Sequence, residues 1–130
     1  MTPANILIIE DHPVNRELFS QVLEASGYGV LQAENATIGI AMARAELPAL
    51  ILMDMSLPGM NGFDATRRLK HDPLTTAIPI IAVTAHAFAK DRAAALSAGC
   101  ISFMSKPIDI IFMIAEIRRI LEATVENIVP

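Results

Sequence analysis

Five short runs of apolar residues recur along the chain, and a longer segment separates each run from the next. They occupy residues 6–9, 29–33, 50–53, 80–83 and 101–104, and the second run is the weakest. Continuous apolar runs of this length are typical of strands that are buried on both faces of a parallel sheet. The pattern therefore predicts five buried strands.

The intervening segments have helical spacing and recognisable ends. They predict helices over residues 13–26, 36–47, 61–71, 88–98 and 108–123. Pro13 suits a first helical turn, Gly27 and Gly99 are stop signals, and Pro48 and Pro73 end the helices that precede them. Strands that alternate with helices across short connections form a parallel sheet with helices on both faces. We therefore expect a doubly wound, five-stranded α/β fold.

The last predicted helix carries more apolar residues than one buried face needs. A core stripe is expected at Ile110, Met113, Ile114, Ile117 and Leu121, which leaves Ile108, Ile111, Phe112 and Ile120 over. The surplus indicates either a wide buried face or part of a surface that binds another protein.

Composition limits what this fold can do. A length of 130 residues, 53% of them hydrophobic, makes one domain with a substantial core, expected over residues 1–123 with a short tail at 124–130 and no output domain. Ten Lys and Arg against fourteen Asp and Glu argue against binding to nucleic acid or to an anionic membrane. One cysteine, no signal peptide and no apolar run of bilayer length predict a cytoplasmic protein.

Polar residues stand where the predicted strands end. Glu10 and Asp11 follow the first strand and Asp54 the third, while Thr84 follows the fourth and the fifth leads into Lys106. In a doubly wound sheet the carboxyl ends of the strands share one edge, where ligands bind. Each residue alone has an ordinary interpretation, such as a helix cap, a strand residue or a solvated charge. Three carboxylates gathered at one edge, however, repel one another unless something compensates their charge.

A divalent cation is the natural compensation. Carboxylate oxygens suit a hard ion, and a site that also has a lysine and room for water suits Mg²⁺ acting on a phosphate. Asp54 is then the nucleophile that forms an acyl phosphate. Lys106 neutralises charge on the phosphoryl oxygens, and Thr84 donates a hydrogen bond to one of them.

Four segments carry a resemblance to the receiver domains of two-component response regulators. They are ILIIEDHPVNRELF, LILMDMSLPGMNGFDATRRLK, PIIAVTAHA and AGCISFMSKPI, and the resemblance extends from residue 6 to about residue 121. It implies a flavodoxin-like sheet with the strand order 2-1-3-4-5. Locally the sequence resembles single-domain cell-division regulators of the DivK type, and also the receivers that hybrid histidine kinases carry.

The resemblance also implies roles for individual residues at the acidic edge. Asp54 matches the phosphoacceptor. Glu10 and Asp11 match the acidic pair that holds Mg²⁺ together with Asp54, and Mn²⁺ can substitute for that ion. Ser56 matches the position whose backbone carbonyl completes the protein ligands of the metal.

Further matches concern the response to the phosphoryl group. Thr84 and Lys106 match the pair that senses it, and Phe103 matches an aromatic residue that moves from exposed to buried on activation. Ser56 and His86 occupy the two positions that tune the lifetime of the phosphoryl group. Pro107 matches a proline that usually follows a cis peptide bond.

These roles predict a stand-alone switch that catalyses only its own phosphoryl transfer and dephosphorylation. Asp54 is expected to accept phosphate from a histidine kinase or a histidine phosphotransfer protein. The output is expected on a downstream protein, in cell-cycle or cell-division control, that binds the face made by residues 88–98, 101–104 and 108–123. The resemblance is compatible with a monomer or with a weak dimer formed on phosphorylation.

Three other interpretations stay open. The chain is alternatively a receiver excised from a hybrid histidine kinase. A Mg²⁺-dependent phosphohydrolase shares the aspartyl nucleophile, but it is expected to place a second acid at the position of Ser56. A flavodoxin-like nucleotide binder needs an open phosphate-binding loop after the first strand, whereas residues 11–15 begin with an acid and contain a proline.

Overall fold

The computed structural model describes residues 3–85 and 88–128, with the side chains of the last four left out. Strands and helices alternate in the order β1 (Asn5–Ile9), α1 (Pro13–Ala25), β2 (Gly29–Ala33), α2 (Ala36–Glu46), β3 (Leu50–Asp54), α3 (Gly62–His71), β4 (Ile80–Thr84), α4 (Ala89–Ala98), β5 (Ser102–Ser105) and α5 (Ile110–Ile128). The strands form one parallel sheet in the order β2-β1-β3-β4-β5. The expected fold class and strand order are confirmed.

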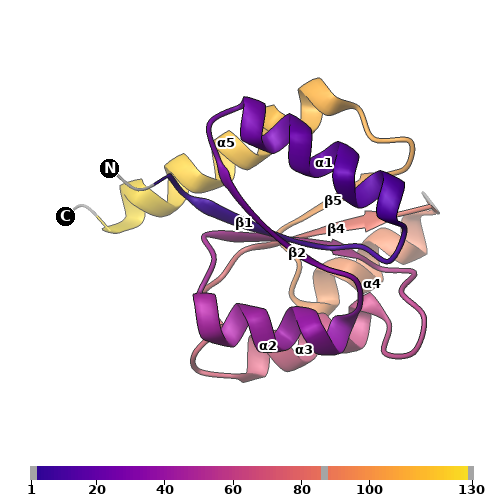
Figure 1. Ribbon diagram of the computed structural model, residues 1–130. Coiled ribbons are helices and arrows are strands. Elements are labelled where there is room, and N and C mark those ends of the chain that lie inside the picture. The colour runs from indigo at the N-terminus through magenta and orange to yellow at the C-terminus, as the bar shows by residue number, and fades with distance from the viewer. Residues whose placement is uncertain (1–2, 86–87, 129–130) are drawn as a thin grey trace.

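The sheet is covered on both faces, as Figure 1 shows, with α1 and α5 on one side and α2, α3 and α4 on the other. The apolar strands follow from this arrangement, because successive side chains of a strand point to opposite faces. In β1, Ile6 and Ile8 pack with the core on the α1–α5 side, whereas Leu7 and Ile9 pack with the core on the opposite side. All four side chains are buried.

Side-chain caps set several of the helix starts. Asn35 accepts a hydrogen bond from the backbone N–H of Ile38 at 2.8 Å, and Asn61 accepts one from Asp64 at 3.0 Å. Asp109 accepts one from the N–H of Phe112 at 3.1 Å. A capping residue lies just outside its helix. For this reason α3 and α5 begin one and two residues later than the sequence pattern predicts.

The α5 helix differs from its prediction at both its end and its core stripe. It continues to Ile128, beyond the predicted end at residue 123. Among its described side chains, Met113, Ile117 and Ile120 are fully buried, so Ile120 belongs to the core, as a wide buried face implies, although it lies outside the expected stripe. Ile110 belongs to the first turn and is 37% exposed, while Ile111 is 83% exposed. Ile114 and Leu121 also pack, partly buried, against the same core. The helix therefore buries a wide face, and the apolar residues left over at its first turn, Ile111 and Phe112, face outward.

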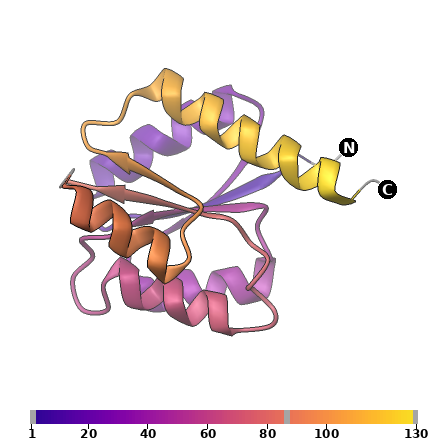
Figure 2. The same ribbon diagram turned by 180° about the vertical axis from the view of Figure 1, so that it is seen from behind.

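Figure 2, which views the molecule from behind, shows α4, β5 and α5 side by side. This is the face that the sequence analysis singles out for a protein partner. Across the described residues, none of the helices combines the length and the hydropathy that crossing a bilayer requires.

Candidate functional site at the carboxyl ends of the strands

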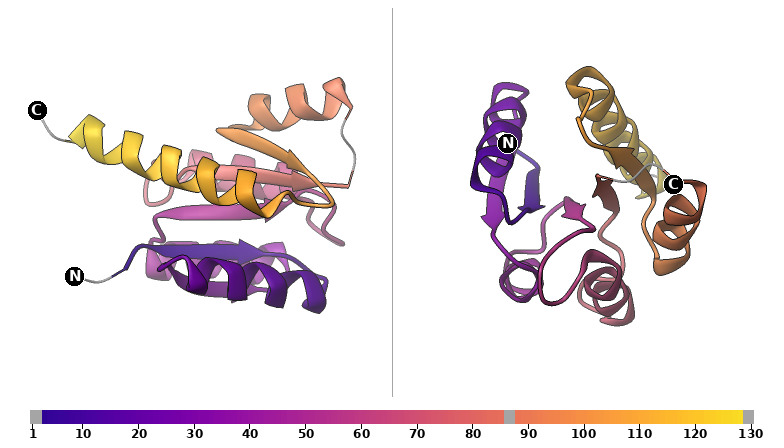
Figure 3. Two further views of the ribbon diagram at one scale, coloured as in Figure 1. Left: turned by 90° about the horizontal axis from the view of Figure 1, so that it is seen from above. Right: turned by 90° about the vertical axis from the view of Figure 1, so that its right-hand side faces the viewer.

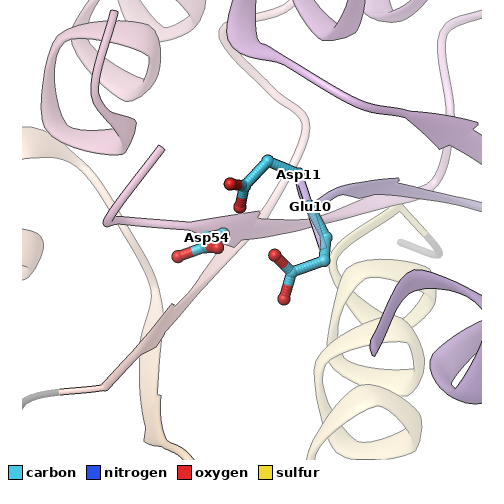
Figure 4. A group of neighbouring side chains, drawn as sticks. All are labelled: Glu10, Asp11 and Asp54. Carbon is cyan, nitrogen blue, oxygen red and sulfur yellow. The ribbon is translucent and has the colours of Figure 1, made fainter. Parts of the chain in front are cut away.

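The acidic residues of the sequence meet at one edge of the sheet. Figure 3, in its right-hand view, looks onto the carboxyl ends of the strands. Glu10 and Asp11 leave the end of β1, and Asp54 is the last residue of β3, the strand that pairs with β1. One carboxylate oxygen from each residue lies within 4.8 Å of the other two (Figure 4). The fold thus brings together groups that are far apart in the chain.

Two of the three carboxylates are almost removed from water. Glu10 is 1% exposed and Asp54 is 4% exposed, whereas Asp11 is exposed. Burying two like charges is costly unless an opposite charge is near. The ammonium group of Lys106 supplies that charge, since Nζ lies 2.8 Å from Oε1 of Glu10 and 3.3 Å from Oδ2 of Asp54.

Backbone groups hold these charged side chains in place. The N–H of Ser56 donates to Oδ1 of Asp54 at 2.9 Å, and the N–H of His12 donates to Oε2 of Glu10 at 3.2 Å. The N–H of Lys106 donates to the carbonyl of Thr84 at 2.6 Å, which ties the loop after β5 to the end of β4. The site is therefore assembled from the ends of four strands.

The two buried carboxylates titrate very differently. Burial and the hydrogen bond and negative charge of Asp54 outweigh Lys106 and raise the pKa of Glu10 to about 7. Burial also acts to raise the pKa of Asp54, but hydrogen bonds from Glu10, Ser56 and Lys106 outweigh it and lower that pKa. The metal-free pair thus holds one proton on Glu10 in mildly acidic solution. With the proton on Glu10, Asp54 remains ionised and pairs with Lys106.

The pKa of Lys106 is raised in the same site. Burial acts against the ammonium form, but the hydrogen bond and charge of Glu10 and the charge of Asp54 outweigh it. Lys106 is consequently cationic throughout the neutral range. Its charge is directed at the two carboxylates that lie deepest in the site.

The donor atoms fit a hard cation such as Mg²⁺. Mg²⁺ prefers oxygen ligands at about 2.1 Å, so that opposite ligands of one ion lie roughly 4 Å apart. The separation of up to 4.8 Å among the oxygens of Glu10, Asp11 and Asp54 needs only a small inward movement to reach that spacing. The exposure of Asp11 leaves one side of the cluster open to water, which Mg²⁺ usually retains.

The remaining residues named from the sequence take different positions. Thr84 is buried at the end of β4, the strand that pairs with β3, and Ser56 is exposed just after Asp54. Phe103 is half-buried in β5, and its ring lines a cavity of about 510 Å³ between α4 and α5. The peptide bond between Lys106 and Pro107 is cis. His86 lies outside the described residues.

Two further residues contact the site, and the sequence pattern does not single them out. The guanidinium of Arg16 donates from Nη1 to the backbone carbonyl of Glu10 at 2.9 Å. Gly62 begins α3 so close to β3 that a Cβ there would lie 2.6 Å from the carbonyl oxygen of Asp54. The role of Arg16 cannot be seen in the sequence, because a side-chain bond to a backbone carbonyl leaves no sequence pattern. For Gly62, the sequence offers only one indication, a glycine directly after the capping residue Asn61.

A family model described as the response regulator receiver domain matches residues 6–118. The chain belongs to this family. As a member, it is a receiver of two-component signalling, and the resemblance inferred from the four sequence segments is confirmed.

Named relatives of this receiver include two proteins that it matches over most of their length. It is 42% identical over 106 residues to the protein PilH of Pseudomonas aeruginosa, a match that covers 82% of this chain and 88% of PilH. It is 40% identical over 108 residues to the polar-differentiation response regulator DivK of Brucella anthropi, covering 83% of this chain and 88% of DivK. In both cases the match spans most of the relative's own length as well as most of this chain.

A solved structure gives a comparison at the level of the site. The receiver domain of a sensor histidine kinase from Pseudomonas aeruginosa is 34% identical and superposes with a TM-score of 0.80, over 94% of this chain and 97% of that one. That structure holds a magnesium ion coordinated in its active-site cleft. The receiver described here presents an acidic cluster of three carboxylates at the carboxyl ends of its strands.

Proposed function

We propose that this receiver is a switch operated by phosphorylation of Asp54. The observation that carries the proposal is the arrangement around this side chain. Asp54 is 4% exposed, stays ionised beside Glu10, and has one carboxylate oxygen bound to Ser56 N–H and the other paired with Lys106. A purely structural aspartate has no need of two further acids within 4.8 Å.

The donor is a phosphorylated histidine, on a histidine kinase or a histidine phosphotransfer protein. In the transfer, a carboxylate oxygen of Asp54 forms a bond to phosphorus while the bond from phosphorus to the imidazole nitrogen breaks. The nitrogen keeps the electron pair. Lys106 neutralises negative charge on the transferred group, and the hydroxyl of Thr84 donates to one of its oxygens once the group is in place.

Mg²⁺ is the cofactor that we assign to the acidic cluster. Glu10, Asp11 and Asp54 hold it through carboxylate oxygens, with the backbone carbonyl of Ser56 as a further ligand, and Mn²⁺ fits the same donors. The bound ion neutralises charge on the phosphoryl oxygens. The magnesium ion in the related receiver of a sensor histidine kinase supports this assignment.

The output surface is the face of α4, β5 and α5. Its cavity of about 510 Å³ is lined by Phe88, Phe103 and Phe112, together with Arg92 and Asp109. Phe88 is 63% and Phe112 is 51% exposed. Aromatic rings with a charged rim suit a protein partner. Phe103 lies three residues before Lys106, so a movement of Lys106 toward a phosphoryl group reaches this cavity through β5.

The most economical role is a stand-alone regulator whose effect is exerted on another protein. The similarity to DivK and PilH over most of their length supports this role. The polar-differentiation regulator DivK further supports a role in cell-cycle or cell-division control. The alternative is a receiver within a hybrid histidine kinase, favoured by the 34% identity to the receiver of a sensor histidine kinase. A turnover phosphohydrolase is disfavoured, because position 56 carries Ser56 instead of a second acid.

The decisive experiment is phosphorylation with acetyl phosphate and Mg²⁺, followed by intact-mass and peptide mapping. The wild type is expected to gain one phosphoryl group on Asp54, and Asp54→Asn is expected to gain none. Asp64→Asn, which removes an exposed acid of α3, is the matched control and is expected to react like the wild type. Phosphorylation of Asp54→Asn at the same site, or steady turnover of phosphomonoesters by the wild type, would overturn the proposal.

A further inference from the structure

Glu10 is held at four points, by four different parts of the fold. Its backbone N–H donates to the carbonyl of Ala33 in β2 at 3.0 Å, and its side chain accepts bonds from His12 and Lys106. The fourth contact is the bond that its backbone carbonyl accepts from Nη1 of Arg16 in α1, at 2.9 Å. Neither the family resemblance nor the sequence pattern assigns a role to this contact with Arg16.

Arg16 is itself fixed by its surroundings. Its backbone N–H donates to the carbonyl of His12 in the first turn of α1, and its carbonyl accepts from the hydroxyl of Ser20 at 2.8 Å. Ser20 is 2% exposed and accepts a hydrogen bond from the side-chain amide of Gln32 in β2 at 2.6 Å. Arg16 therefore connects a helix anchored on β2 to the end of β1, where the acidic pair begins.

The carbonyl that Arg16 binds belongs to the peptide joining Glu10 to Asp11. A peptide unit is planar, so fixing the direction of its carbonyl fixes the plane that connects the two Cα atoms. Fixing that plane limits the directions in which the side chains of Glu10 and Asp11 can leave the backbone, since only the torsion of each residue beside the plane remains free. Asp11 is the exposed member of the cluster, and among the described residues no hydrogen bond or ion pair of its own side chain orients it.

We propose that Arg16 is a positioning residue for the acidic pair, which it orients toward a divalent cation through the Glu10–Asp11 peptide. This inference rests on the proposed function of the cluster as a Mg²⁺ site. Partners of metal ligands commonly act in this way, and their removal weakens metal binding by about 10- to 100-fold. The positive charge of Arg16 has the opposite effect, because it repels a cation. The two effects differ in sign, so an experiment can separate them.

The test measures Mg²⁺ affinity by isothermal titration calorimetry above the pKa of Glu10. Arg16→Ala is expected to weaken binding by about tenfold or more. Arg16→Lys keeps a cationic donor and is expected to recover part of that loss. Arg118→Ala removes an exposed arginine of α5, with the same change of net charge, and is expected to bind like the wild type. Unchanged or tighter binding by Arg16→Ala would overturn the proposal.

A second measurement separates positioning from general damage to the fold. Phosphorylation by acetyl phosphate is followed as a function of Mg²⁺ concentration. Arg16→Ala is expected to raise the half-saturating Mg²⁺ concentration while the rate at saturating Mg²⁺ changes by less than about twofold, since the nucleophile is untouched. A lower saturating rate with unchanged half-saturation contradicts positioning. If Arg16→Ala does not fold, Arg16→Met, which keeps much of the side-chain length but has no donor for the Glu10 carbonyl, takes its place in both measurements, with the same expected results.

The outcomes distinguish this inference from the proposed function. If the wild type is phosphorylated on Asp54 and Arg16→Ala binds Mg²⁺ like the wild type, only the role of Arg16 is wrong. If Mg²⁺ binding depends on Arg16 as expected but Asp54 accepts no phosphoryl group, only the proposed function is wrong. A wild type that binds no Mg²⁺ contradicts both.

Discussion

At the scale of single residues, the site depends on how two buried carboxylates share one cation and one proton. Lys106 pairs with both Glu10 and Asp54, but one ammonium group balances only one carboxylate. The surplus negative charge is relieved by a proton on Glu10, whose pKa is raised to about 7. If the cluster holds Mg²⁺ as proposed, the ion takes the place of that proton, and protons and Mg²⁺ are expected to compete for the same side chain.

The raised pKa of Glu10 predicts how the stability of the metal-free protein depends on pH. The pKa lies above its ordinary value of 4.5, so the folded state holds the proton more tightly than the unfolded chain does. The stabilisation from Glu10 is therefore complete below pH 4.5 and is lost as the pH rises through about 7. We expect the free energy of unfolding to fall by roughly 1–3 kcal/mol across that interval, measured by urea denaturation in the presence of a chelator.

Glu10→Gln isolates this contribution, because glutamine resembles the protonated carboxyl and does not titrate. Between about pH 5 and 8, the free energy of unfolding is expected to fall less in Glu10→Gln than in the wild type. Asp54 does not interfere, since its pKa is lowered and its contribution is lost only as the pH falls into the acidic range. Parallel pH profiles for the two proteins would show that Glu10 does not carry the proton.

At the scale of helices and strands, most of the fold could be predicted from the periodicity of apolar residues. The strand bounds agree with the prediction to within a residue, because strands buried on both faces leave continuous apolar runs. The start of α5 was harder to predict, because the cap at Asp109 sets it and the apolar pattern does not. Which apolar residues of α5 face the sheet depends on its packing, which periodicity alone does not determine.

The close packing of α3 against β3 predicts a large effect of Gly62→Ala. The added Cβ would lie 2.6 Å from Asp54 O and from the Cα of Met55, and backbone atoms cannot yield cheaply. We expect a loss of about 1–3 kcal/mol in stability and slower phosphorylation, because the strand end that carries Asp54 must shift. Chemical denaturation and the acetyl phosphate reaction measure the two effects.

Gly59→Ala is the matched control for the same loop. Gly59 has a φ of +75°, but a Cβ there meets nothing within 4 Å. The substitution is expected to cost about 1–2 kcal/mol in stability through backbone strain while leaving the phosphorylation rate near that of the wild type. A similar loss of rate in both variants would mean that loop strain, and not contact with Asp54, is responsible.

The burial pattern of α5 predicts unequal effects of two substitutions. Met113 is fully buried, so Met113→Ala is expected to lower the free energy of unfolding by about 2–5 kcal/mol. Ile111 is 83% exposed, and Ile111→Ala is expected to change the free energy of unfolding by less than about 0.5 kcal/mol. Urea denaturation tests both. A large loss from Ile111→Ala would show that this residue is covered in the protein in solution.

At the scale of the whole molecule, the fold makes a site that no local segment contains. Glu10, Asp54, Thr84 and Lys106 come from four strand ends, and a parallel sheet places all of these ends along one edge. The meeting of these residues could be predicted from the sequence for that reason. The proton on Glu10 and the contact of Arg16 could not, because they depend on burial and on distances that only the folded chain defines.

Because the proposed metal ligands come from the ends of two strands, β1 and β3, Mg²⁺ is expected to stabilise the whole domain. A ligand present at about 100 times its dissociation constant adds roughly 2.7 kcal/mol to the free energy of unfolding. Asp11→Asn is expected to lose most of this gain, since it removes one of the three carboxylates proposed to bind the ion. Without metal the same variant is expected to be at least as stable as the wild type, because it also removes a charge that repels Glu10 and Asp54.

The order of stability of the two proteins should therefore reverse when Mg²⁺ is added, which a general defect in folding cannot produce. Thermal unfolding followed by circular dichroism, with chelator and with saturating Mg²⁺, tests the reversal. Glu17→Gln removes an exposed acid of α1 outside the cluster and is expected to gain stability from Mg²⁺ as the wild type does. An equal gain in Asp11→Asn would show that the cation binds elsewhere, and the acidic edge would then lose its role as the metal site.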